Sequence, residues 1–472
     1  MRSILPPKIT KKIPKEVLEI FQKFSDAGYE IYLVGGGVRN LLTGKVPVNC
    51  DFTTNAHPEV IQTLFPDSFY DNRFGTVGLM IKRGKKEERY EITTYRSEKG
   101  YSDSRHPDKI YWGKSLEEDL KRREFTISAM VIGPLRLSLD KLGIAQGKPT
   151  NHQNFELIDL FGGMEDFKNK IVRAVGNPQE RFLEDALRLM RAVRLASQLG
   201  FIIEPETFGA IKNNAHLLNR ISRERIREEL FKILGSDFPA EGIILLMTSG
   251  LLPYIIPELL KGYGLDQKGH HIFDVWNHSL QSLKNCPSKD PIVRLATLIH
   301  DIGKPYVVKG EGANRTFYNH EVAGGKIAEN LADRLKFSKD EKEKLVILVR
   351  WHQFTCDERQ TDSAIRRFIR NIGKENLQDM LDLRVGDRLG GGAKETSWRL
   401  EKFKQRLVEV QKQPFTVQDL KINGHDVMKV LGLKPGPKVG EVLNKIFEEV
   451  EENRLENKKE ILLKKLQKIK DE

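Results

Sequence analysis

Hydrophobic residues recur along this chain in two rhythms that predict different secondary structures. Between residues 14 and 27 they fall three and four positions apart, which predicts an amphipathic helix. Residues 58–65 predict a second helix, because Pro58 suits a first helical turn. Residues 31–34, 76–81 and 90–95 are short apolar or alternating runs, which predict strands. The first part of the chain is therefore expected to mix a sheet with helices.

From residue 161 onward the pattern is largely helical. Across residues 181–195, Phe182, Ala186, Leu189 and Val193 would share one face of a single helix. Asp185, Arg188 and Arg191 would share another face. We expect a multidomain α/β plus all-α protein, in which a head with a mixed sheet (residues 1–160) precedes three helical parts. These are a neck (161–255), a body (256–400) and a tail (401–472).

Three consecutive glycines, Gly35, Gly36 and Gly37, follow the predicted strand at residues 31–34 and open a helix. Such a strand–turn–helix unit directs backbone N–H groups at an anion, and Arg39 would add a charge-assisted contact to a phosphate. A second strand is expected just downstream. Residues 49 and 51 would lie on one of its faces, where a pair of carboxylates could hold a divalent metal. This chain has one carboxylate there, Asp51, and one amide, Asn49.

These two stretches resemble the head of the class II tRNA nucleotidyltransferases (CCA-adding enzymes) and bacterial poly(A) polymerases, a polymerase-beta-like fold. The family motifs are Gly-Gly-x-Val-Arg-Asp and Asp-x-Asp-x-x-Thr, and this chain departs from them at Asn40 and Asn49. The resemblance implies catalysis with Mg²⁺ at Asp51, weakened by Asn49. It also suggests a further carboxylate, Glu91, on the strand at residues 90–95.

Residues 117–129 resemble a further family motif, Asp-Leu-x-x-Arg-Arg-Asp-Phe-Thr-x-Asn-Ala, with one residue fewer before the arginine pair. Arg123 matches the arginine that binds nucleotide, and Glu124 stands where the family usually has Asp. Read without the family, Glu118 and Arg122 would form an i,i+4 pair on a helix surface. Residues 96–113 correspond to a mobile loop that is tied to the switch from C to A addition.

The predicted helix at 181–195 resembles the family motif Glu-Asp-x-x-Arg-x-x-Arg-x-x-Arg, which is complete at Glu184, Asp185, Arg188, Arg191 and Arg194. The resemblance implies that these residues bind the nucleotide and that Asp185 and Arg188 choose the base. Cytosine and adenine each present an amino donor beside a ring-nitrogen acceptor, which match a carboxylate and a guanidinium. Uracil and guanine present the opposite pattern, so one pair of side chains would admit CTP and ATP.

The body contains a second set of candidate ligands. In order along the chain they are His278, His300, Asp301, His320, His352 and Asp387. The order resembles the HD superfamily of metal-dependent phosphohydrolases, with His278, His300, Asp301 and Asp387 as ligands. His320 and His352 would support a second metal. Imidazole and carboxylate together suit a transition metal such as Mn²⁺ or Ni²⁺ better than Mg²⁺ alone. An HD fold kept only as a structural body is the alternative.

Charge and composition narrow the partners. The net charge is +12, which favours a polyanion partner. No apolar run reaches the length of a membrane span. The three cysteines lie far apart, which argues against a disulfide framework and a zinc knuckle, so we expect a reducing, cytoplasmic location.

Residues 420–440 resemble the tail motif of the same family. The resemblance implies that the tail contacts tRNA.

The resulting hypothesis is template-independent addition of C and A to the tRNA 3′ end from CTP and ATP, with release of pyrophosphate. Three alternatives stay open. The first is that the chain is a poly(A) polymerase. The second is that it is a partial enzyme that adds only CC or only A. The third is that it is an HD phosphohydrolase whose head binds nucleotide without polymerising. Because Asn49 is neutral and ligates through one oxygen, we expect the head to turn over slowly or not at all.

Overall fold

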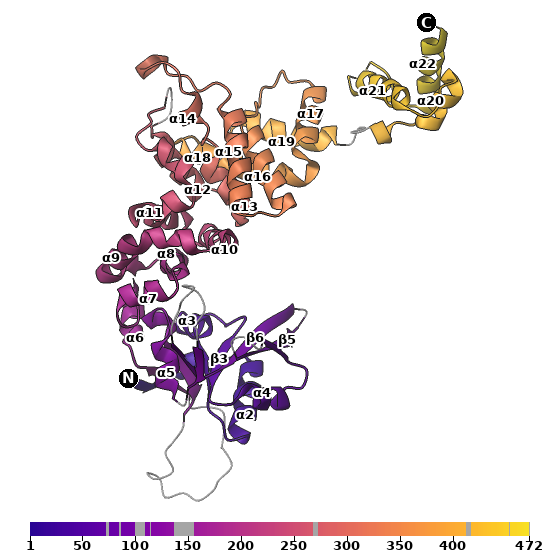
Figure 1. Cartoon of the computed structure of the whole chain (residues 1–472). Coiled ribbons are helices and arrows are strands. Elements are labelled where there is room, and N and C mark those ends of the chain that lie inside the picture. The colour runs from indigo at the N-terminus through magenta and orange to yellow at the C-terminus, as the bar shows by residue number, and fades with distance from the viewer. Residues whose placement is uncertain are drawn as a thin grey trace, which may run out of the picture. The chain divides into compact units, whose positions relative to one another are not determined.

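A computed structural model describes residues 1–71, 75–84, 86–99, 109–113, 115–135, 155–267, 272–411, 417–452 and 454–471. The chain divides into two compact units, Met1–Ile255 and Ile256–Glu472. Both can be followed by colour in Figure 1, from indigo to magenta for the first and from magenta to yellow for the second. In the described residues, no helix is both long and apolar enough to span a bilayer. Residues 100–108, within the stretch at 96–113 that is compared with a family loop, lie outside the described residues.

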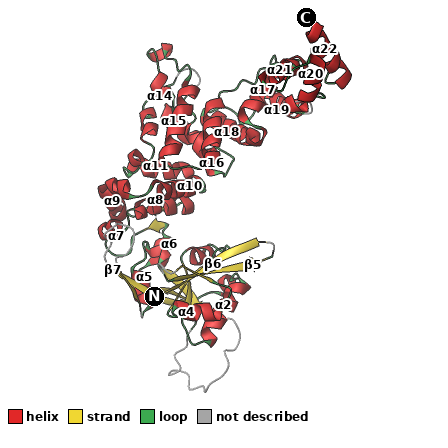
Figure 2. Cartoon of the chain, turned by 45° about the vertical axis from the view of Figure 1, so that its right-hand side comes forward, coloured by secondary structure: helices red, strands yellow, loops and turns green. Residues whose placement is uncertain are grey.

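The first unit is built on a mixed sheet, drawn in yellow in Figure 2. Among the described residues its strand order is β1-β10-β9-β2-β3-β6-β5-β4, and every neighbouring pair is antiparallel except β3 and β6. In chain order its strands are β1 (Arg2–Ile4), β2 (Ile31–Val34), β3 (Asp51–Thr54), β4 (Phe69–Asp71), β5 (Thr76–Arg83), β6 (Lys86–Thr94), β9 (Met130–Pro134) and β10 (Phe155–Asp159). The mixed sheet and the strands predicted at 31–34, 76–81 and 90–95 are thus confirmed.

Several helices accompany this sheet, and the predicted helices at 14–27 and 58–65 are confirmed as α2 and α4. Helix α2 buries Val17, Ile20, Phe21 and Phe24, so its apolar stripe supplies part of the core. The helices that belong to the head are α1 (Pro7–Thr10), α2 (Lys15–Asp26), α3 (Gly36–Leu42), α4 (Pro58–Leu64) and α5 (Leu116–Lys121). A separate hairpin joins β7 (Arg96–Lys99) to β8 (Lys109–Trp112).

The rest of the first unit is helical apart from a short parallel pair, β11 (Ile171–Val172) and β12 (Ile202–Ile203). Helix α8 lies at its centre, because it contacts both α10 and α11 and buries most of its apolar side chains. The helices are α6 (Gly163–Lys168), α7 (Pro178–Glu184), α8 (Leu187–Leu199), α9 (Pro205–Asn214), α10 (Arg223–Leu234) and α11 (Pro239–Thr248).

The single helix predicted across residues 181–195 is wrong, because the chain leaves the helical conformation at Asp185. Its φ of −142° and ψ of 106° are extended and end α7. The Asp185 carboxylate accepts the backbone N–H of Leu187 at 3.0 Å, as an N-cap residue does, and α8 begins there. The two helices therefore meet at Asp185, which does not share a continuous helical face with Arg188.

The second unit is helical throughout its described elements. Its helices are α12 (Val275–Lys284), α13 (Pro291–Ile299), α14 (Lys304–Val307), α15 (His320–Arg334), α16 (Lys339–Trp351), α17 (Asp362–Ile372), α18 (Leu377–Gly390), α19 (Trp398–Val410), α20 (Gly424–Leu431), α21 (Pro437–Glu451) and α22 (Lys459–Asp471). The last three of these helices enclose a hydrophobic cluster that includes Val427, Ile446 and Leu462, so the tail has an apolar core of its own.

Candidate active sites

The glycine turn of the head joins β2 to α3, and two of its glycines are required by the backbone. Gly35 has φ 67° and ψ −125°, a conformation open almost only to glycine. At Gly37 a Cβ would lie 2.9 Å from a methyl carbon of Leu33, so a side chain there would displace the strand residue. Asp51 lies beside this turn, since a Cβ on Gly35 would be 3.7 Å from its Oδ2. The start of α3 therefore faces a carboxylate site.

Asp51 and Glu91 are the two carboxylates of this site. They are register partners on the parallel strands β3 and β6, which puts both side chains on one face of the sheet. Burial, with the nearby charge of Glu91, raises the pKa of Asp51 to about 6. Glu91 also pairs with Arg89 at 2.8 Å. Two neighbouring carboxylates are stabilised by a bound cation, and hard oxygen ligands fit Mg²⁺.

Asn49 does not lie beside Asp51 on the strand, so that expectation is wrong. Strand β3 begins at Asp51, and Asn49 precedes it in the left-handed conformation, with φ 49°. Its side-chain Oδ1 accepts the backbone N–H of Arg89, on β6, at 3.2 Å. Asparagine tolerates this conformation better than most residues. In this structure Asn49 ties the entrance of β3 to β6.

Two arginines face the same region of the head. Arg39, on α3, donates to the Ser128 hydroxyl at 2.9 Å and to the Ile127 carbonyl at 3.4 Å. Burial and the neighbouring Arg194 lower the pKa of Arg39 to about 10, which leaves it a cation at neutral pH. Arg123 donates to Asp119 at 3.2 Å. Both guanidinium groups are coupled electrostatically to Asp51, so cations and carboxylates occupy one site.

Asp119 lies within the stretch that resembles a family motif, but no role was assigned to it from the sequence. Its side chain is 0% exposed and accepts from Thr53 at 2.9 Å, from Arg122 at 2.6 Å and from Arg123. Burial raises the pKa of Asp119, but the two guanidinium groups outweigh this and keep it below its ordinary value. Arg122 pairs with Asp119 at 2.6 Å. The spacing of Asp119 three and four residues before the arginines was the available signal.

The nucleotide-binding candidates of the neck each have an acidic or basic partner. Arg188 contacts Glu184 at 2.5 Å, and its Nη1 also donates to the Arg181 carbonyl at 3.1 Å. The remaining ion pairs are Asp185–Arg225 at 3.2 Å, Arg191–Glu124 at 3.1 Å and Arg194–Glu229 at 2.9 Å. Glu124 belongs to the head, so its pair with Arg191 joins the head motif to α8. Arg225, on α10, was not among the residues selected from the sequence.

The six candidate ligands of the body converge in the second unit. His278 Nε2 lies 3.1 Å from His300 Nε2 and 3.2 Å from Asp387 Oδ1, and His300 Nε2 lies 3.2 Å from Asp301 Oδ2. The other oxygen of Asp301 lies 3.2 Å from His320 Nε2 and 3.8 Å from His352 Nε2. Two groups of ligand atoms therefore share one carboxylate, one group on each oxygen.

The orientation of three imidazoles is set by the backbone. The Nδ1 atoms of His300, His320 and His352 lie 2.7 to 2.9 Å from the carbonyls of Thr297, Phe317 and Val349. A carbonyl only accepts, so each Nδ1 carries a proton and each Nε2 atom faces the centre. Imidazoles held in this orientation would present their Nε2 atoms to a transition metal.

An open cavity surrounds this centre. Besides the ligands it is lined by the polar or aromatic side chains of Gln267, Lys304, Arg315, Phe317, Tyr318 and Arg384. Lys304 Nζ lies 2.6 Å from Asp301 Oδ2. Three cations beside a set of metal ligands would bind the negative charge of a phosphate ester.

Comparison with known protein families gives three matches along the chain. The model of the "Poly A polymerase head domain" matches residues 31–173. Residues 200–262 match the "Probable RNA and SrmB- binding site of polymerase A", and residues 320–466 match "tRNA nucleotidyltransferase domain 2 putative". The fold of the head and its family match define a nucleotidyltransferase.

Similarity to individual proteins extends over nearly the whole length. The chain is 33% identical to a CCA-adding enzyme of Ligilactobacillus salivarius, over 98% of this chain and 99% of that one. It is 31% identical to the CCA-adding enzyme of Geobacillus stearothermophilus, over 94% and 95% of the two chains. These full-length matches show that the chain belongs to the CCA-adding enzyme family.

Solved structures agree with this assignment. A crystal structure of the Bacillus stearothermophilus CCA-adding enzyme in complex with CTP superposes with a TM-score of 0.70 and 28% identity, over 99% of this chain and 98% of that one. The Thermotoga maritima CCA-adding enzyme, solved with tRNA, has 20% identity and a TM-score of 0.59, over 99% and 98% of the two chains. At that lower identity the likeness concerns the fold alone.

Proposed function

We propose that this chain adds C and A nucleotides to the 3′ end of tRNA, from CTP and ATP, without a nucleic-acid template. The observation that carries this proposal is the similarity to CCA-adding enzymes over 98% of the chain. In the reaction the terminal tRNA hydroxyl attacks the α-phosphate of the nucleotide, a new P–O bond forms, and pyrophosphate leaves.

The residues of the head divide this work between binding and catalysis. Gly35 and Gly36 let the triphosphate approach the N-terminus of α3, and Arg39 and Arg123 offset its charge. Asp119 accepts a hydrogen bond from Arg123, which fixes the direction of the Arg123 guanidinium. Mg²⁺ bound at Asp51 and Glu91 would lower the pKa of the attacking hydroxyl and neutralise the leaving group.

Base choice is assigned to Asp185 and Arg188. A carboxylate that accepts an amino group and a guanidinium that donates to a ring nitrogen fit cytosine and adenine and oppose uracil and guanine. Arg191 and Arg194 continue the basic side of α8 towards Glu124 and Arg39 of the head. They would bind the phosphates or ribose of the same nucleotide.

The test of this assignment is an equilibrium titration with CTP, ATP, UTP and GTP in the absence of tRNA. Asp185→Ala and Arg188→Ala should each lose about 1–3 kcal/mol of preference for CTP and ATP, the usual worth of a paired contact to a base edge. Arg220→Ala, which removes an exposed arginine of the same unit, serves as the control. Unchanged preference in both variants would assign base choice elsewhere.

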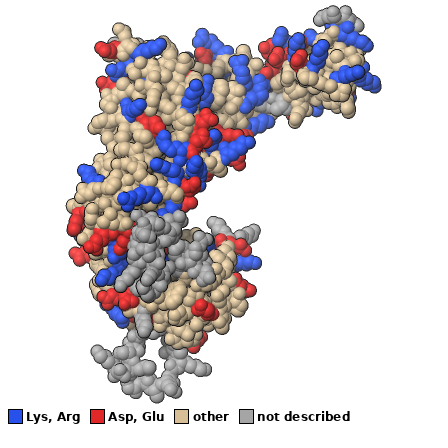
Figure 3. Space-filling view, viewed as in Figure 1, with Lys and Arg blue, Asp and Glu red and all other residues tan. Residues whose placement is uncertain are grey.

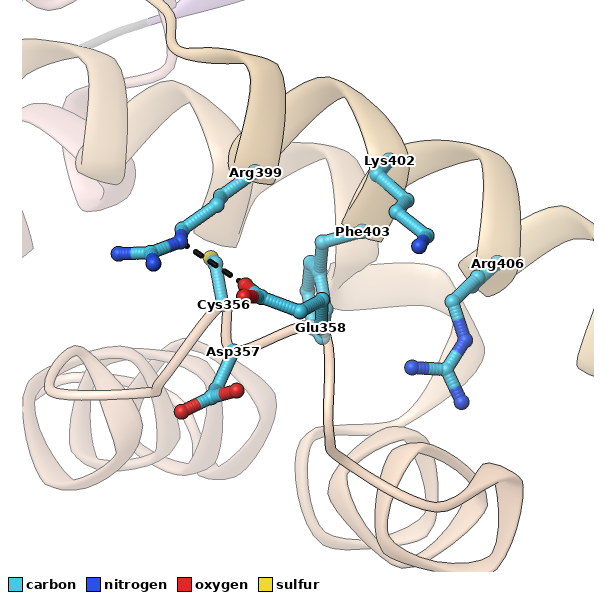
Figure 4. A pocket seen from close by; sticks show the side chains of 7 residues that line it. All are labelled: Cys356, Asp357, Glu358, Arg399, Lys402, Phe403 and Arg406. Atoms are coloured by element: carbon cyan, nitrogen blue, oxygen red, sulfur yellow. Dashed lines mark hydrogen bonds and ion pairs between the residues drawn. The ribbon is translucent and has the colours of Figure 1, made fainter.

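Contact with tRNA is proposed for the basic surface of the second unit, where lysines and arginines are spread among acidic side chains in Figure 3. Helix α19 offers one such stretch. Arg399, Lys402 and Arg406 lie along the side of α19 that faces the loop with Asp357 and Glu358 in Figure 4. Trp398 is 63% exposed, with the Arg399 guanidinium 5.2 Å from its ring centre. Arg399 and Lys402 are exposed, and cations beside an aromatic ring suit phosphates and bases.

A second function is proposed for the body, namely hydrolysis of a phosphate ester with a transition metal such as Mn²⁺ or Ni²⁺. It is favoured by the four imidazole nitrogens and two carboxylates that converge there. His278, His300, Asp301 and Asp387 would hold one metal, and Asp301, His320 and His352 would hold another. Lys304 and Arg384, which line the cavity, would bind the phosphate.

A further inference from the structure

The base-selecting carboxylate of the neck is held from two sides. Its Oδ1 accepts the backbone N–H of Leu187 at 3.0 Å, which ties it to the start of α8. Its Oδ2 accepts from Nη2 of Arg225, on α10, at 3.2 Å. A carboxylate has about four acceptor positions, so Asp185 keeps acceptor capacity for a ligand while both oxygens are anchored.

Within the described part of the chain, the guanidinium of Arg225 has one nitrogen whose hydrogen-bonding capacity is not used. Among the described residues its Nη1 is buried and makes no hydrogen bond, although Nη2 of the same guanidinium is paired with Asp185. Buried donors are nearly always satisfied, and an unsatisfied one is destabilising. A donor left over at a ligand-binding carboxylate is accounted for if a bound molecule supplies its acceptor.

The backbone of Asp185 is less restrained than that of a residue inside a helix, so a contact from another element helps to fix its side chain. Asp185 lies between α7 and α8 in an extended conformation, so no helical hydrogen-bond ladder fixes its backbone from both sides. Arg188 has a comparable support, because Glu184 holds its guanidinium and Arg181 in turn holds Glu184. Asp185 and Arg188 are thus each paired with a residue of opposite charge, Arg225 and Glu184 respectively.

We propose that Arg225 is the positioning residue for base selection: it fixes the Asp185 carboxylate in the direction that accepts the amino group of cytosine or adenine. This inference rests on the proposed function of Asp185. Without Arg225, the carboxylate would keep only its hydrogen bond from the Leu187 N–H, and the position of Oδ2 would no longer be fixed.

The test compares Arg225→Ala and Arg225→Lys with the wild-type chain. Equilibrium dissociation constants are measured for CTP, ATP, UTP and GTP, because binding is read without any turnover. Arg225→Ala should lose roughly tenfold in its preference for CTP and ATP, the worth of a hydrogen bond to a charged group. Arg225→Lys should recover part of it, since one ammonium reaches one oxygen but lacks the fork.

A double-mutant cycle separates positioning from a general structural role. In an Asp185→Ala background, Arg225→Ala should change the base preference no further, because the group that it orients is gone. Arg220→Ala again controls for the lost charge. The proposal is overturned if the two changes are additive, or if Arg225→Ala weakens binding of all four nucleotides equally. A wild-type chain with no base preference would instead contradict the proposed function itself.

Discussion

At the scale of single residues, the head depends on two neighbouring carboxylates, Asp51 and Glu91, on one face of the sheet. The pKa of Asp51 is raised from its ordinary value of 3.8 to about 6, through burial and then through the charge of Glu91. The folded state therefore binds the proton more tightly than the unfolded chain does. As the pH rises from about 4 to 6, ionisation of Asp51 lowers the free energy of unfolding. Ionised Asp51, which Mg²⁺ requires, is present above about pH 6.

We predict that Asp51 titrates near pH 6 in the metal-free protein. Glu91→Gln should lower that midpoint, because it removes the second negative charge and leaves the burial unchanged. The measurement is the carboxyl carbon chemical shift of Asp51 as a function of pH. Affinity of the head for Mg²⁺ should fall as the pH is lowered through the same range. A midpoint close to the ordinary value of about 4 in the wild-type chain would show that Glu91 and burial have no such effect.

Asn49 gives a second prediction at this scale. Asn49→Asp should keep the hydrogen bond from the Arg89 N–H, since a carboxylate oxygen accepts as an amide oxygen does. The second carboxylate oxygen, which that hydrogen bond does not need, would be available to bind Mg²⁺ together with Asp51. If it does so, nucleotide addition should rise sharply, on the order of a thousandfold for a restored metal ligand. Nucleotide affinity without metal should hardly change. Asn49→Ala is the control, and equal rates for the wild-type chain and the Asn49→Asp variant would contradict the argument.

At the scale of elements, close helix packing brings the ligands of the body together. Gly386 and Gly390 flank Asp387 on α18 and face Ser282, which lies one turn after His278 on α12. A Cβ on Gly390 would lie 2.6 Å from the Ser282 backbone nitrogen, and one on Gly386 would lie 2.7 Å from the Ser282 carbonyl. Only glycine lets the two helices approach this closely.

Gly390→Ala should therefore separate α12 from α18. We expect a loss of about 1–3 kcal/mol in the free energy of unfolding, as for an overpacked core, and a weaker affinity for Mn²⁺ measured by calorimetry. Gly391→Ala is a matched control, because a Cβ there meets no atom closer than 3.5 Å. Equal effects of the two substitutions would show that the helix spacing is not what holds Asp387 beside His278.

Elements also show where sequence reasoning reaches its limit. Apolar spacing predicted α2, α4 and the central strands, because their burial follows local periodicity. The break at Asp185 could not be read from that spacing, since the side chain competes for the Leu187 N–H within an otherwise helical pattern. The conformation of Asn49 depends on Arg89, forty residues later, and the contact of Asp185 with Arg225 depends on the packing of α8 against α10.

At the scale of the whole molecule, the two proposed chemistries belong to different compact units, Met1–Ile255 and Ile256–Glu472. We predict that His300→Ala and Asp301→Ala abolish hydrolysis of a phosphomonoester or a 2′,3′-cyclic phosphodiester in the presence of Mn²⁺ or Ni²⁺. Nucleotide addition by the same variants should stay within about twofold of wild type, because the substitutions lie in the other compact unit. A twofold change corresponds to under roughly 0.5 kcal/mol of activation energy. The converse variant, Asp51→Ala, should lose addition and keep hydrolysis. Hydrolysis that survives in both body variants would come from another site.

The most direct test of the central claim is to sequence the 3′ ends of a tRNA that lacks CCA after incubation with CTP, ATP and Mg²⁺. We predict that the wild-type chain produces ends that finish in C, C and A in that order, and that the Asn49→Asp chain produces them faster. UTP and GTP should not replace CTP and ATP. Unchanged ends with both chains, or tails of adenosine alone, would contradict the assignment of this protein as a CCA-adding enzyme.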